Sequence, residues 1–208
     1  TSARGIGFFT VLGLAKAGYT VHGTVREQSK GEPLLEEAKK QGLGDRVKIA
    51  ILRDVSDSNS VEKAFNDVLR QEGHIDVLVN NSAISIPGAF EGISEEDFHE
   101  VYNTNVLGVI LCTQQVLPSM RQRKSGTIIN VSSRLGIVAS PMISLYASSK
   151  WALEGISQAL HQELQVTSPP PKRSEKNKID KMHSSHLELE CSYRSRSGLG
   201  LPSLRVSE

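Results

Sequence analysis

The sequence predicts an α/β fold, with one doubly wound parallel sheet between two layers of helices. Apolar runs of strand length alternate with longer segments of helical period, a pattern typical of a parallel sheet whose strands are joined by helices. The runs at 77–79 and 128–129 have almost no polar side. Strands of this kind are expected where helices cover both faces of a sheet.

Each expected element follows from its local pattern. Strands are predicted at residues 19–25, 47–52, 76–80 and 127–131, and helices at 6–17, 33–41, 60–71, 94–121 and 145–165. Ser94, with Asp97 three residues later, gives the helix at 94–121 a capping-box start. A doubly wound sheet leads into its first helix from a strand. Because this chain begins with a helix, we expect the first strand to be absent.

Composition separates a folded part, residues 1–166, from a tail, residues 167–208. The 42 residues of the tail include nine Ser, four Pro and eight Lys or Arg, and its apolar residues follow no sustained period. We therefore expect the first part to form one incomplete domain and the tail to have little order.

Charge and cysteine content limit the classes of partner. Lys and Arg number 24 against 23 Asp and Glu, so neither a nucleic acid nor an anionic membrane is an expected partner. Two cysteines are too few for a disulfide framework. The sequence has no run of about 20 apolar residues and no signal peptide. We expect a cytoplasmic protein with no membrane segment and no metal site.

The first helix opens on Arg4-Gly5-Ile6-Gly7. In such a turn, glycines let backbone N–H groups approach a phosphate at the helix N-terminus; the other interpretation is that they only permit close packing. Arg26 follows the next expected strand, where an acidic residue would bind the ribose 2′-hydroxyl of NAD. With Arg4 it would instead pair with a 2′-phosphate. The sequence therefore favours NADP(H) over NAD(H), unless both arginines are merely exposed surface charges.

Two further strand ends carry candidate cofactor ligands. Asp54 follows the strand at 47–52, and would either accept a hydrogen bond from an adenine amino group or cap the next turn. Asn80 and Asn81 lie at the end of the strand at 76–80, on the edge where open α/β sheets bind ligands. Asparagines are also common in the turns that follow strands. The dipeptide alone therefore does not distinguish a cofactor ligand from a turn.

Tyr146 and Lys150 lie four residues apart at the start of the last expected helix, so both side chains project from one face. A phenol ionises only near pH 10 and exchanges protons poorly at neutrality. A neighbouring ammonium favours the phenolate, and the tyrosine then becomes a usable general acid or base. This pair taken alone occurs by chance in many helices.

Two polar residues complete the candidate catalytic set. Ser133 lies 13 residues before Tyr146, beyond the strand at 127–131, and would polarise a carbonyl or hold an alcohol oxygen. Ser132 is the neighbouring alternative. Asn105 lies in an apolar stretch of the long helix, where a buried amide needs partners such as a water or lysine relay.

In combination these residues resemble the short-chain dehydrogenase/reductase family. Its motifs occur in order over about residues 1–166, as Arg4-Gly5-Ile6-Gly7, Asp54-Val55, Asp76-x-Leu-Val-Asn80-Asn81, Asn105-Val-x-Gly108, Asn130-Val-Ser-Ser133 and Tyr146-x-x-x-Lys150. The resemblance implies a Rossmann-like fold and an NAD(P)-dependent hydride transfer between nicotinamide and a small-molecule carbonyl or alcohol. It also implies a homo-oligomer that pairs through the two long helices.

The resemblance implies a role for each candidate residue. Tyr146 would exchange the proton, and Lys150 would hold the nicotinamide ribose and favour the phenolate. Ser133 would orient the substrate oxygen, and Asn105 would support a proton relay. The implied cofactor-binding residues are Arg4, Gly5, Ile6, Gly7, Arg26, Asp54, Val55, Asn80, Tyr146 and Lys150.

The chain departs from the family pattern in three places. Thr1 lies where the family has the first glycine of its turn, and Ser82-Ala83 replaces the family's Ala-Gly. The proline run at 169–171 argues against the central strand that the family places next. We therefore expect a chain that lacks its first and last strands and has reduced stability and activity. The alternative function is a catalytically impaired form that binds nucleotide or pairs with full-length relatives.

Overall fold

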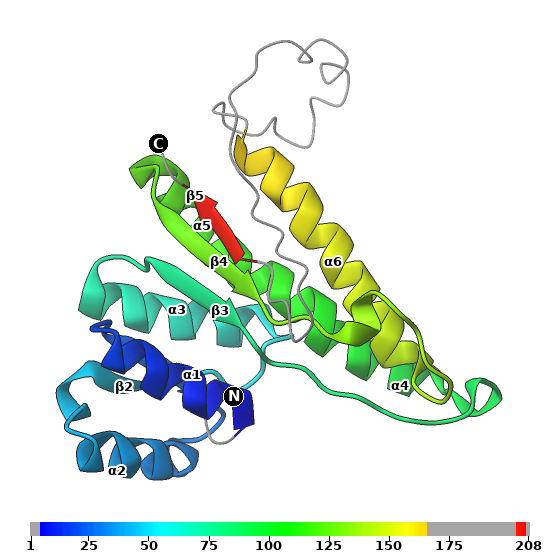
Figure 1. The fold of residues 1–208 in the computed structure, drawn as a ribbon, viewed down its shortest axis with the longest axis horizontal. Helices are drawn as coiled ribbons and strands as arrows, with labels where there is room; N and C mark the ends of the chain where they lie inside the picture. The colour runs from blue at the N-terminus through cyan, green and yellow to red at the C-terminus, as the bar shows by residue number, and fades with distance from the viewer. Residues whose placement is uncertain (1–4, 166–202, 207–208) are drawn as a thin grey trace.

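The computed structural model describes residues 5–165 and 203–206, with helices on both sides of short strands (Figure 1). The strands are β1 (Val21–Val25), β2 (Val47–Ile51), β3 (Val77–Asn80), β4 (Gly126–Asn130) and β5 (Ser203–Val206). The helices are α1 (Gly5–Lys16), α2 (Glu32–Lys40), α3 (Ser58–Glu72), α4 (Glu95–Tyr102), α5 (Gly108–Arg123) and α6 (Ser144–Gln165). Short helical turns are η1 (Gln28–Gly31), η2 (Gly44–Arg46), η3 (Phe90–Gly92), η4 (Asn103–Leu107) and η5 (Arg134–Gly136).

The strands form two sheets where the sequence predicts one. β1 pairs in parallel with β2, with Val21 opposite Val47. β3 pairs in parallel with β4, with Val77 opposite Thr127. Within the described residues no strand joins β1 to β3. The predicted α/β architecture with parallel central strands is present, and its sheet is divided between β1 and β3.

Strand β5 differs from the expectation for the tail. Residues 203–206 pair antiparallel with β4, although the sequence predicts little order after residue 166. The edge of β4 that faces away from β3 offers backbone groups for pairing, and the short alternating segment Ser-Leu-Arg-Val occupies it. The rest of the expected tail, and residues 1–4, lie outside the described residues.

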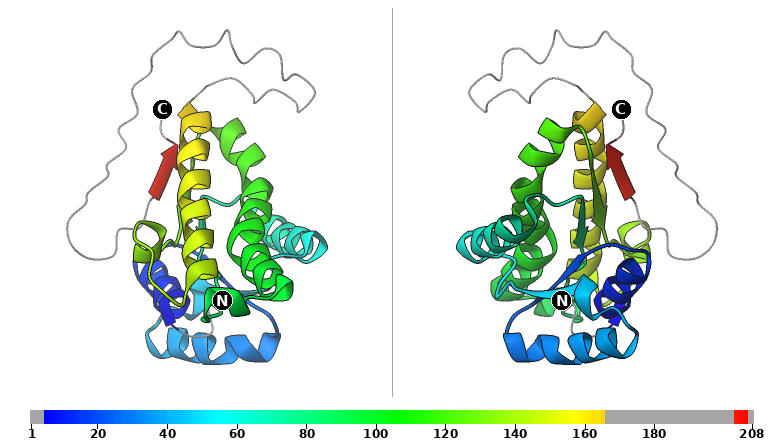
Figure 2. Two further views of the ribbon diagram at one scale, coloured as in Figure 1. Left: turned by 90° about the vertical axis from the view of Figure 1, so that its right-hand side faces the viewer. Right: turned by 90° about the vertical axis from the view of Figure 1, so that its left-hand side faces the viewer.

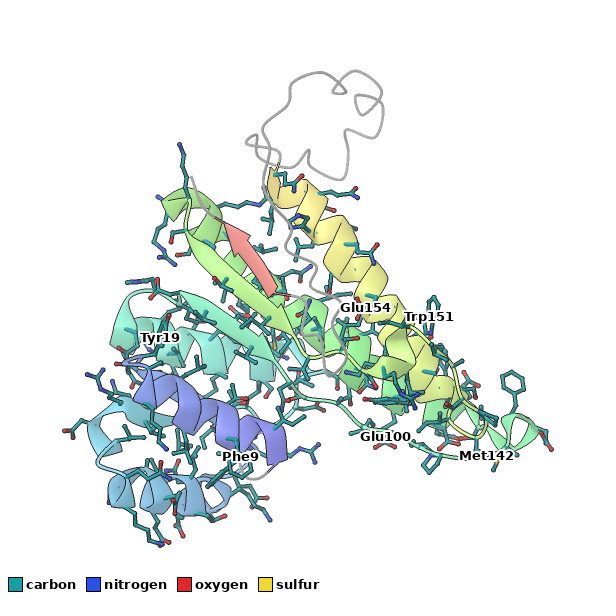
Figure 3. All side chains as sticks on the ribbon, in the orientation of Figure 1. Phe9, Tyr19, Glu100, Met142, Trp151 and Glu154 are labelled. Atoms are coloured by element: carbon teal, nitrogen blue, oxygen red, sulfur yellow. The ribbon has the colours of Figure 1, made fainter. Side chains whose placement is uncertain are left out.

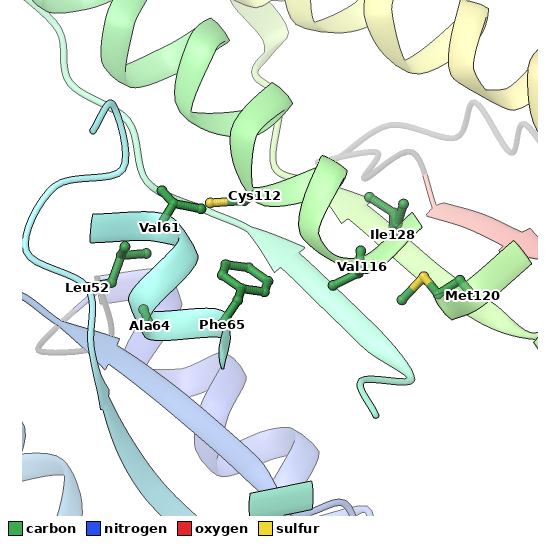
Figure 4. Close-up of a cluster of buried hydrophobic side chains, with 8 residues drawn as sticks. All are labelled: Leu52, Val61, Ala64, Phe65, Cys112, Val116, Met120 and Ile128. Carbon is green, nitrogen blue, oxygen red and sulfur yellow. The ribbon is translucent and has the colours of Figure 1, made fainter. Parts of the chain in front are cut away.

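Helices cover the strands on two sides. Figure 2 shows α1 and α3 on opposite sides of the strands, and α5 and α6 side by side. α6 lies on the side of α3 and α5, since its Leu160 packs against the apolar cluster there. One cluster of buried apolar side chains lies where α3 and α5 face the strands (Figure 4), and consists of Leu52, Val61, Ala64, Phe65, Cys112, Val116, Met120 and Ile128. A second cluster belongs to α1, α2 and β2, and consists of Val11, Leu12, Ala15, Leu34, Ala38 and Val47. None of the helices between residues 5 and 165 is long and apolar enough to span a membrane.

The helix predicted at 94–121 is interrupted. Its capping box forms, because Ser94 Oγ accepts a hydrogen bond from Asp97 N and the Asp97 carboxylate accepts one from Ser94 N. α4 then ends at Tyr102, and the π-helical turn η4 separates it from α5. Such turns inside helices are frequent at functional sites, and this one carries the buried Asn105.

Gly108, the first residue of α5, lets this helix approach the segment that follows β2. A Cβ atom at Gly108 would lie 2.8 Å from Val55 Cγ2 and 3.2 Å from the Val55 carbonyl oxygen. Because one of these atoms belongs to the backbone, the contact cannot be relieved by a change of side-chain rotamer alone.

We predict that Gly108→Ala lowers the free energy of unfolding by about 1 to 3 kcal/mol, the usual effect of overpacking. Gly155→Ala in α6 is the matched control, because no atom of the described residues lies within 4 Å of a Cβ at Gly155. An alanine there should raise the free energy of unfolding by up to about 1 kcal/mol. Urea unfolding followed by circular dichroism measures both changes. Equal stability of Gly108→Ala and the parent would show that α5 does not depend on this close approach.

Candidate active site

Tyr146 and Lys150 lie in the first two turns of α6, close to the end of β4. The Lys150 Nζ atom is 5.6 Å from the centre of the Tyr146 ring, so the two side chains share one face of the helix, as their spacing predicts. Trp151 and Glu154, which are labelled in Figure 3, mark this part of α6.

The ammonium group of Lys150 is buried and bonded to the end of β4. Only 3% of the residue is exposed, and Nζ donates a hydrogen bond of 2.8 Å to the carbonyl oxygen of Val131. Burial lowers the pKa of Lys150 to about 8, against the opposing influence of the negative charge on Glu154. Lys150 therefore places a desolvated charge beside Tyr146 at neutral pH.

Ser133 begins the turn η5, directly after β4. Its hydroxyl oxygen accepts a hydrogen bond of 3.1 Å from the N–H of Leu135. The neighbouring Ser132 Oγ is buried and has no hydrogen-bond partner among the described residues. Gly136 brings η5 against α6, since a Cβ there would lie 3.0 Å from Ser132 Oγ and 3.1 Å from the Lys150 carbonyl oxygen. The structure thus brings the segment of Ser133 next to that of Lys150.

Asn105 is fully buried and joins three segments. Its Oδ1 accepts a hydrogen bond of 2.8 Å from the N–H of Ile84. Its Nδ2 donates to the carbonyl oxygen of Ile84 and to Ser149 Oγ, both at 2.9 Å. The side chain in η4 therefore holds both the loop after β3 and the first turns of α6. This agrees with the expectation that a buried amide here needs several partners.

Asn80, which the sequence predicts as a cofactor ligand, bonds to other buried residues. Its Nδ2 donates to Asn130 Oδ1 at 2.9 Å and to Thr113 Oγ1 at 3.2 Å. Asn130 Nδ2 in turn donates to Ser157 Oγ at 2.8 Å. The roles of Asn130 and Ser157 were not predicted from the sequence. Each of two predicted buried strands ends in an asparagine, and buried amides need hydrogen-bond partners. This pattern could have indicated that the two side chains bond to each other.

The glycine turn begins α1. Gly5 has a φ of 67°, a conformation that glycine adopts without the penalty of a side chain. Among the described residues, nothing lies within 4 Å of a Cβ at this position. Gly7 is buried and Ile6 is exposed, whereas Arg4 lies outside the described residues. The positive φ of Gly5 at the start of α1 fits a turn that a phosphate group approaches.

Asp54 and Arg26 come close enough to interact at the ends of β2 and β1. Asp54 Oδ1 accepts hydrogen bonds from the N–H and the hydroxyl of Ser56, at 2.8 and 2.7 Å. These two bonds, and then the positive charge of Arg26, lower the pKa of Asp54. Asp54 thus caps a turn, which is one of the two roles that the sequence allows, and remains exposed with Arg26. Val55 packs against the core below Gly108.

Known proteins share both the sequence and the fold. The family model for short chain dehydrogenases matches residues 1–168. The 3-ketodihydrosphingosine reductase of Bacteroides thetaiotaomicron is 36% identical over 163 residues, which are 78% of this chain and 56% of that protein. The NADPH-dependent pterin aldehyde reductase of Arabidopsis thaliana is 34% identical over 163 residues, 78% of this chain and 66% of that protein.

Two solved structures resemble the present one. A short-chain dehydrogenase from Streptomyces avermitilis has a TM-score of 0.72 and 33% identity, over 78% of this chain and 58% of that chain. A gluconate 5-dehydrogenase from Burkholderia cenocepacia, in complex with NADP and tartrate, has a TM-score of 0.72 and 30% identity, over 78% of this chain and 62% of that chain. The chain spans a little over half of the first of the curated relatives named above and about two thirds of the other. With the motifs in family order and the family model matched over most of its length, the chain belongs to the short-chain dehydrogenase family.

Proposed function

We propose that residues 1–166 form the nucleotide-binding domain of an NADP(H)-dependent oxidoreductase that interconverts a carbonyl and an alcohol on a small molecule. The observation that carries this proposal is the buried Lys150 ammonium, 5.6 Å from the centre of the Tyr146 ring. When bound, the nicotinamide supplies or accepts the hydride, which no protein side chain can do.

Tyr146 moves the proton to or from the substrate oxygen. The positive charge of Lys150 favours the phenolate, and burial strengthens this influence because little water screens it. The Val131 carbonyl holds Nζ in place. Because the pKa of Lys150 is about 8, its charge is present at neutral pH and is lost as the pH rises through that value.

Ser133 orients the substrate oxygen. Its hydroxyl oxygen accepts from Leu135 N, so its own proton remains free to be donated to a carbonyl. Asn105 is a positioning residue that holds Ser149, the neighbour of Lys150, through a hydrogen bond of 2.9 Å. Asn105 Oδ1 accepts one hydrogen bond from Ile84 N and has a second lone pair. A water molecule in the proton relay would donate to this second lone pair.

The cofactor contacts follow the carboxyl edge of the strands. Arg26, exposed at the end of β1, pairs with a 2′-phosphate, and its position beside Asp54 supports a site at this edge. NADP is present in the structure of the gluconate 5-dehydrogenase relative, which supports NADP(H) over NAD(H). The proposed cofactor-binding residues are Arg4, Gly5, Ile6, Gly7, Arg26, Asp54, Val55, Asn80, Tyr146 and Lys150.

A second candidate function is nucleotide binding without turnover, or pairing with a full-length relative. The divided sheet favours it, because the gap lies between β1 and β3, whose ends carry candidate cofactor residues. Large apolar side chains at Leu107, next to α5, and at Trp151 on α6 are also exposed. α5 and α6 would form the surface that pairs with a second copy of this chain or with a full-length relative.

We predict that Tyr146→Phe lowers the rate of NADPH oxidation with a panel of ketones and aldehydes by about 100-fold or more, because the general acid is lost. NADPH binding, followed by the fluorescence of the half-exposed Trp151, should persist. Tyr19→Phe is the control, because Tyr19 lies before β1, away from the carboxyl ends of the strands. A Tyr146→Phe rate equal to that of the parent would reject the mechanism, and binding without turnover in the parent would favour the second function.

Arg26→Glu should weaken NADPH binding by about 10-fold to 100-fold, because a charge-assisted pair contributes roughly 1.5 to 3 kcal/mol. NADH has no 2′-phosphate, so its affinity should not fall. Arg70→Glu on the exposed face of α3 is the control for a change of net charge. Equal losses of NADPH and NADH affinity in Arg26→Glu would contradict the assignment of Arg26 to the 2′-phosphate.

Asn105→Ala should lower the free energy of unfolding by about 1 to 3 kcal/mol, because it leaves buried groups at Ile84 and Ser149 without their partner. Asn103→Ala, an exposed position in the same turn η4, should change it by less than about 0.5 kcal/mol. Thermal unfolding compares the two variants. Similar effects at both positions would mean that the buried amide does not hold the loop to α6.

A further inference from the structure

Glu154, which is labelled in Figure 3, lies one helical turn after Lys150 on α6. Residues four apart share one face of a helix. The stem of the Glu154 side chain packs under the turn η5, because a Cβ atom at Gly136 would lie only 3.3 Å from Glu154 Cγ. Ser132 Oγ, a buried hydroxyl without a partner among the described residues, lies 3.0 Å from the same position. Glu154 is therefore held on the side of α6 that faces the segment between β4 and η5, where Ser132 offers a hydrogen-bond donor.

The buried charge of Lys150 has a neutral partner but no carboxylate within salt-bridge distance. Its Nζ atom donates to the carbonyl oxygen of Val131, and none of the salt bridges between residues 5 and 165 includes Lys150. A buried charge without an ion-pair partner is costly, and burial accordingly lowers the pKa of Lys150. The ammonium form therefore depends on any negative charge that acts from a greater distance.

Glu154 supplies such a charge. Its carboxylate raises the pKa of Lys150, against the larger and opposite influence of burial. Two charges that are too far apart for a salt bridge still interact across a protein interior, because little water screens them. The interaction therefore needs no direct hydrogen bond between the two side chains.

Within residues 5–165, the other elements packed against this part of α6 bring no competing charge. β4 and η4 have no charged or titratable side chain. η5 carries the exposed Arg134, and the carboxylate of Asp97 in α4 closes the capping box. The remaining titratable side chains of α4 are the exposed Glu95, Glu96, His99 and Glu100, and Tyr102, which stacks on Phe98. On α6 itself, the Tyr146 ring faces Lys150. Of all these groups, Glu154 is the one whose charge acts on Lys150.

We propose that Glu154 is a positioning residue of the candidate active site, and that its carboxylate is the counter-charge that keeps Lys150 in the ammonium form beside Tyr146. Gly136 leaves room for the Glu154 stem, so η5 and α6 together hold the carboxylate in place. The other interpretation is that Glu154 only packs against η5, a role that requires its stem and not its charge. The consequence for catalysis rests on the proposed function, whereas the interaction between the two charges does not.

The test is the titration of Lys150 Nζ by NMR, without NADPH, in the complete 208-residue chain with ¹⁵N-labelled lysine. The parent should have its midpoint near the pKa of about 8. In Glu154→Gln the midpoint should fall by at least about half a pH unit, because an ammonium without its counter-charge releases its proton more readily. Glu163→Gln is the matched control, since Glu163 is exposed near the end of the same helix. Its midpoint should equal that of the parent.

Two further measurements separate the charge of Glu154 from its packing. Glu154→Asp shortens the side chain but keeps the charge, so its midpoint should lie closer to that of the parent than the midpoint of Glu154→Gln does. The alkaline limb of kcat/KM for NADPH oxidation should move to lower pH in Glu154→Gln together with the midpoint, because this limb reports groups of the free enzyme. A loss of packing alone would lower the rate at every pH and leave the limb in place.

A midpoint in Glu154→Gln equal to that of the parent would overturn the proposal. An equal fall in Glu154→Gln and Glu163→Gln would also overturn it, because net charge alone would then explain the change. An alkaline limb that stays in place in an active chain would reject the role of Glu154 in catalysis. A lower midpoint in a chain that oxidises no NADPH would support the counter-charge and count against the proposed oxidoreductase function, so the two proposals fail by different observations.

Discussion

The hydrogen bond from Lys150 Nζ to the carbonyl oxygen of Val131 fixes the relation between α6 and β4. It joins the helix that carries Tyr146 to the end of the strand that leads to Ser133. A buried ammonium needs partners, because desolvation of its charge is unfavourable. The carbonyl at the end of β4 is such a partner, and it can serve only if α6 begins beside this edge of the sheet. The arrangement of the candidate catalytic groups follows from that requirement.

Buried amides hold the surrounding elements in the same way. Asn105 connects η4, the loop after β3 and α6, while Asn80 and Asn130 connect the ends of β3 and β4. These side chains are polar where the sequence around them is apolar, and each finds several partners. Their hydrogen bonds restrict the conformations of the loops at the carboxyl edge of the strands. The site is therefore built on bonded side chains as well as on the strands below it.

Much of this fold could be predicted from local patterns. The four predicted strands agree with β1 to β4 to within two residues at either end, because buried parallel strands are short continuous apolar runs. The helix predicted at 94–121 is divided at η4, which hydrophobic periodicity does not reveal, because a π turn changes only one repeat. Pairing of β5 with β4 depends on residues far apart in the chain, and composition carries no such information.

For the candidate site, the sequence predicted the positions of several residues but not the hydrogen bonds that they form. The spacing of Tyr146 and Lys150 was sufficient to place both on one face of α6, since a helix has a fixed repeat. The position of Asn80 was also correct, at the carboxyl edge of β3. Its hydrogen bonds to Asn130 and Thr113 could not be foreseen, because they depend on the register between β3 and β4 and on the packing of α5.

The most direct test of this account is the titration of Lys150 by NMR, with the Nζ resonance assigned through its absence in Lys150→Arg. Burial beside Val131 predicts a midpoint near the pKa of about 8 that the structure gives for Lys150. A midpoint near 10.5, the ordinary value for lysine, would mean that water reaches the ammonium. The Tyr146 site would then lack the desolvated charge on which the proposed chemistry depends.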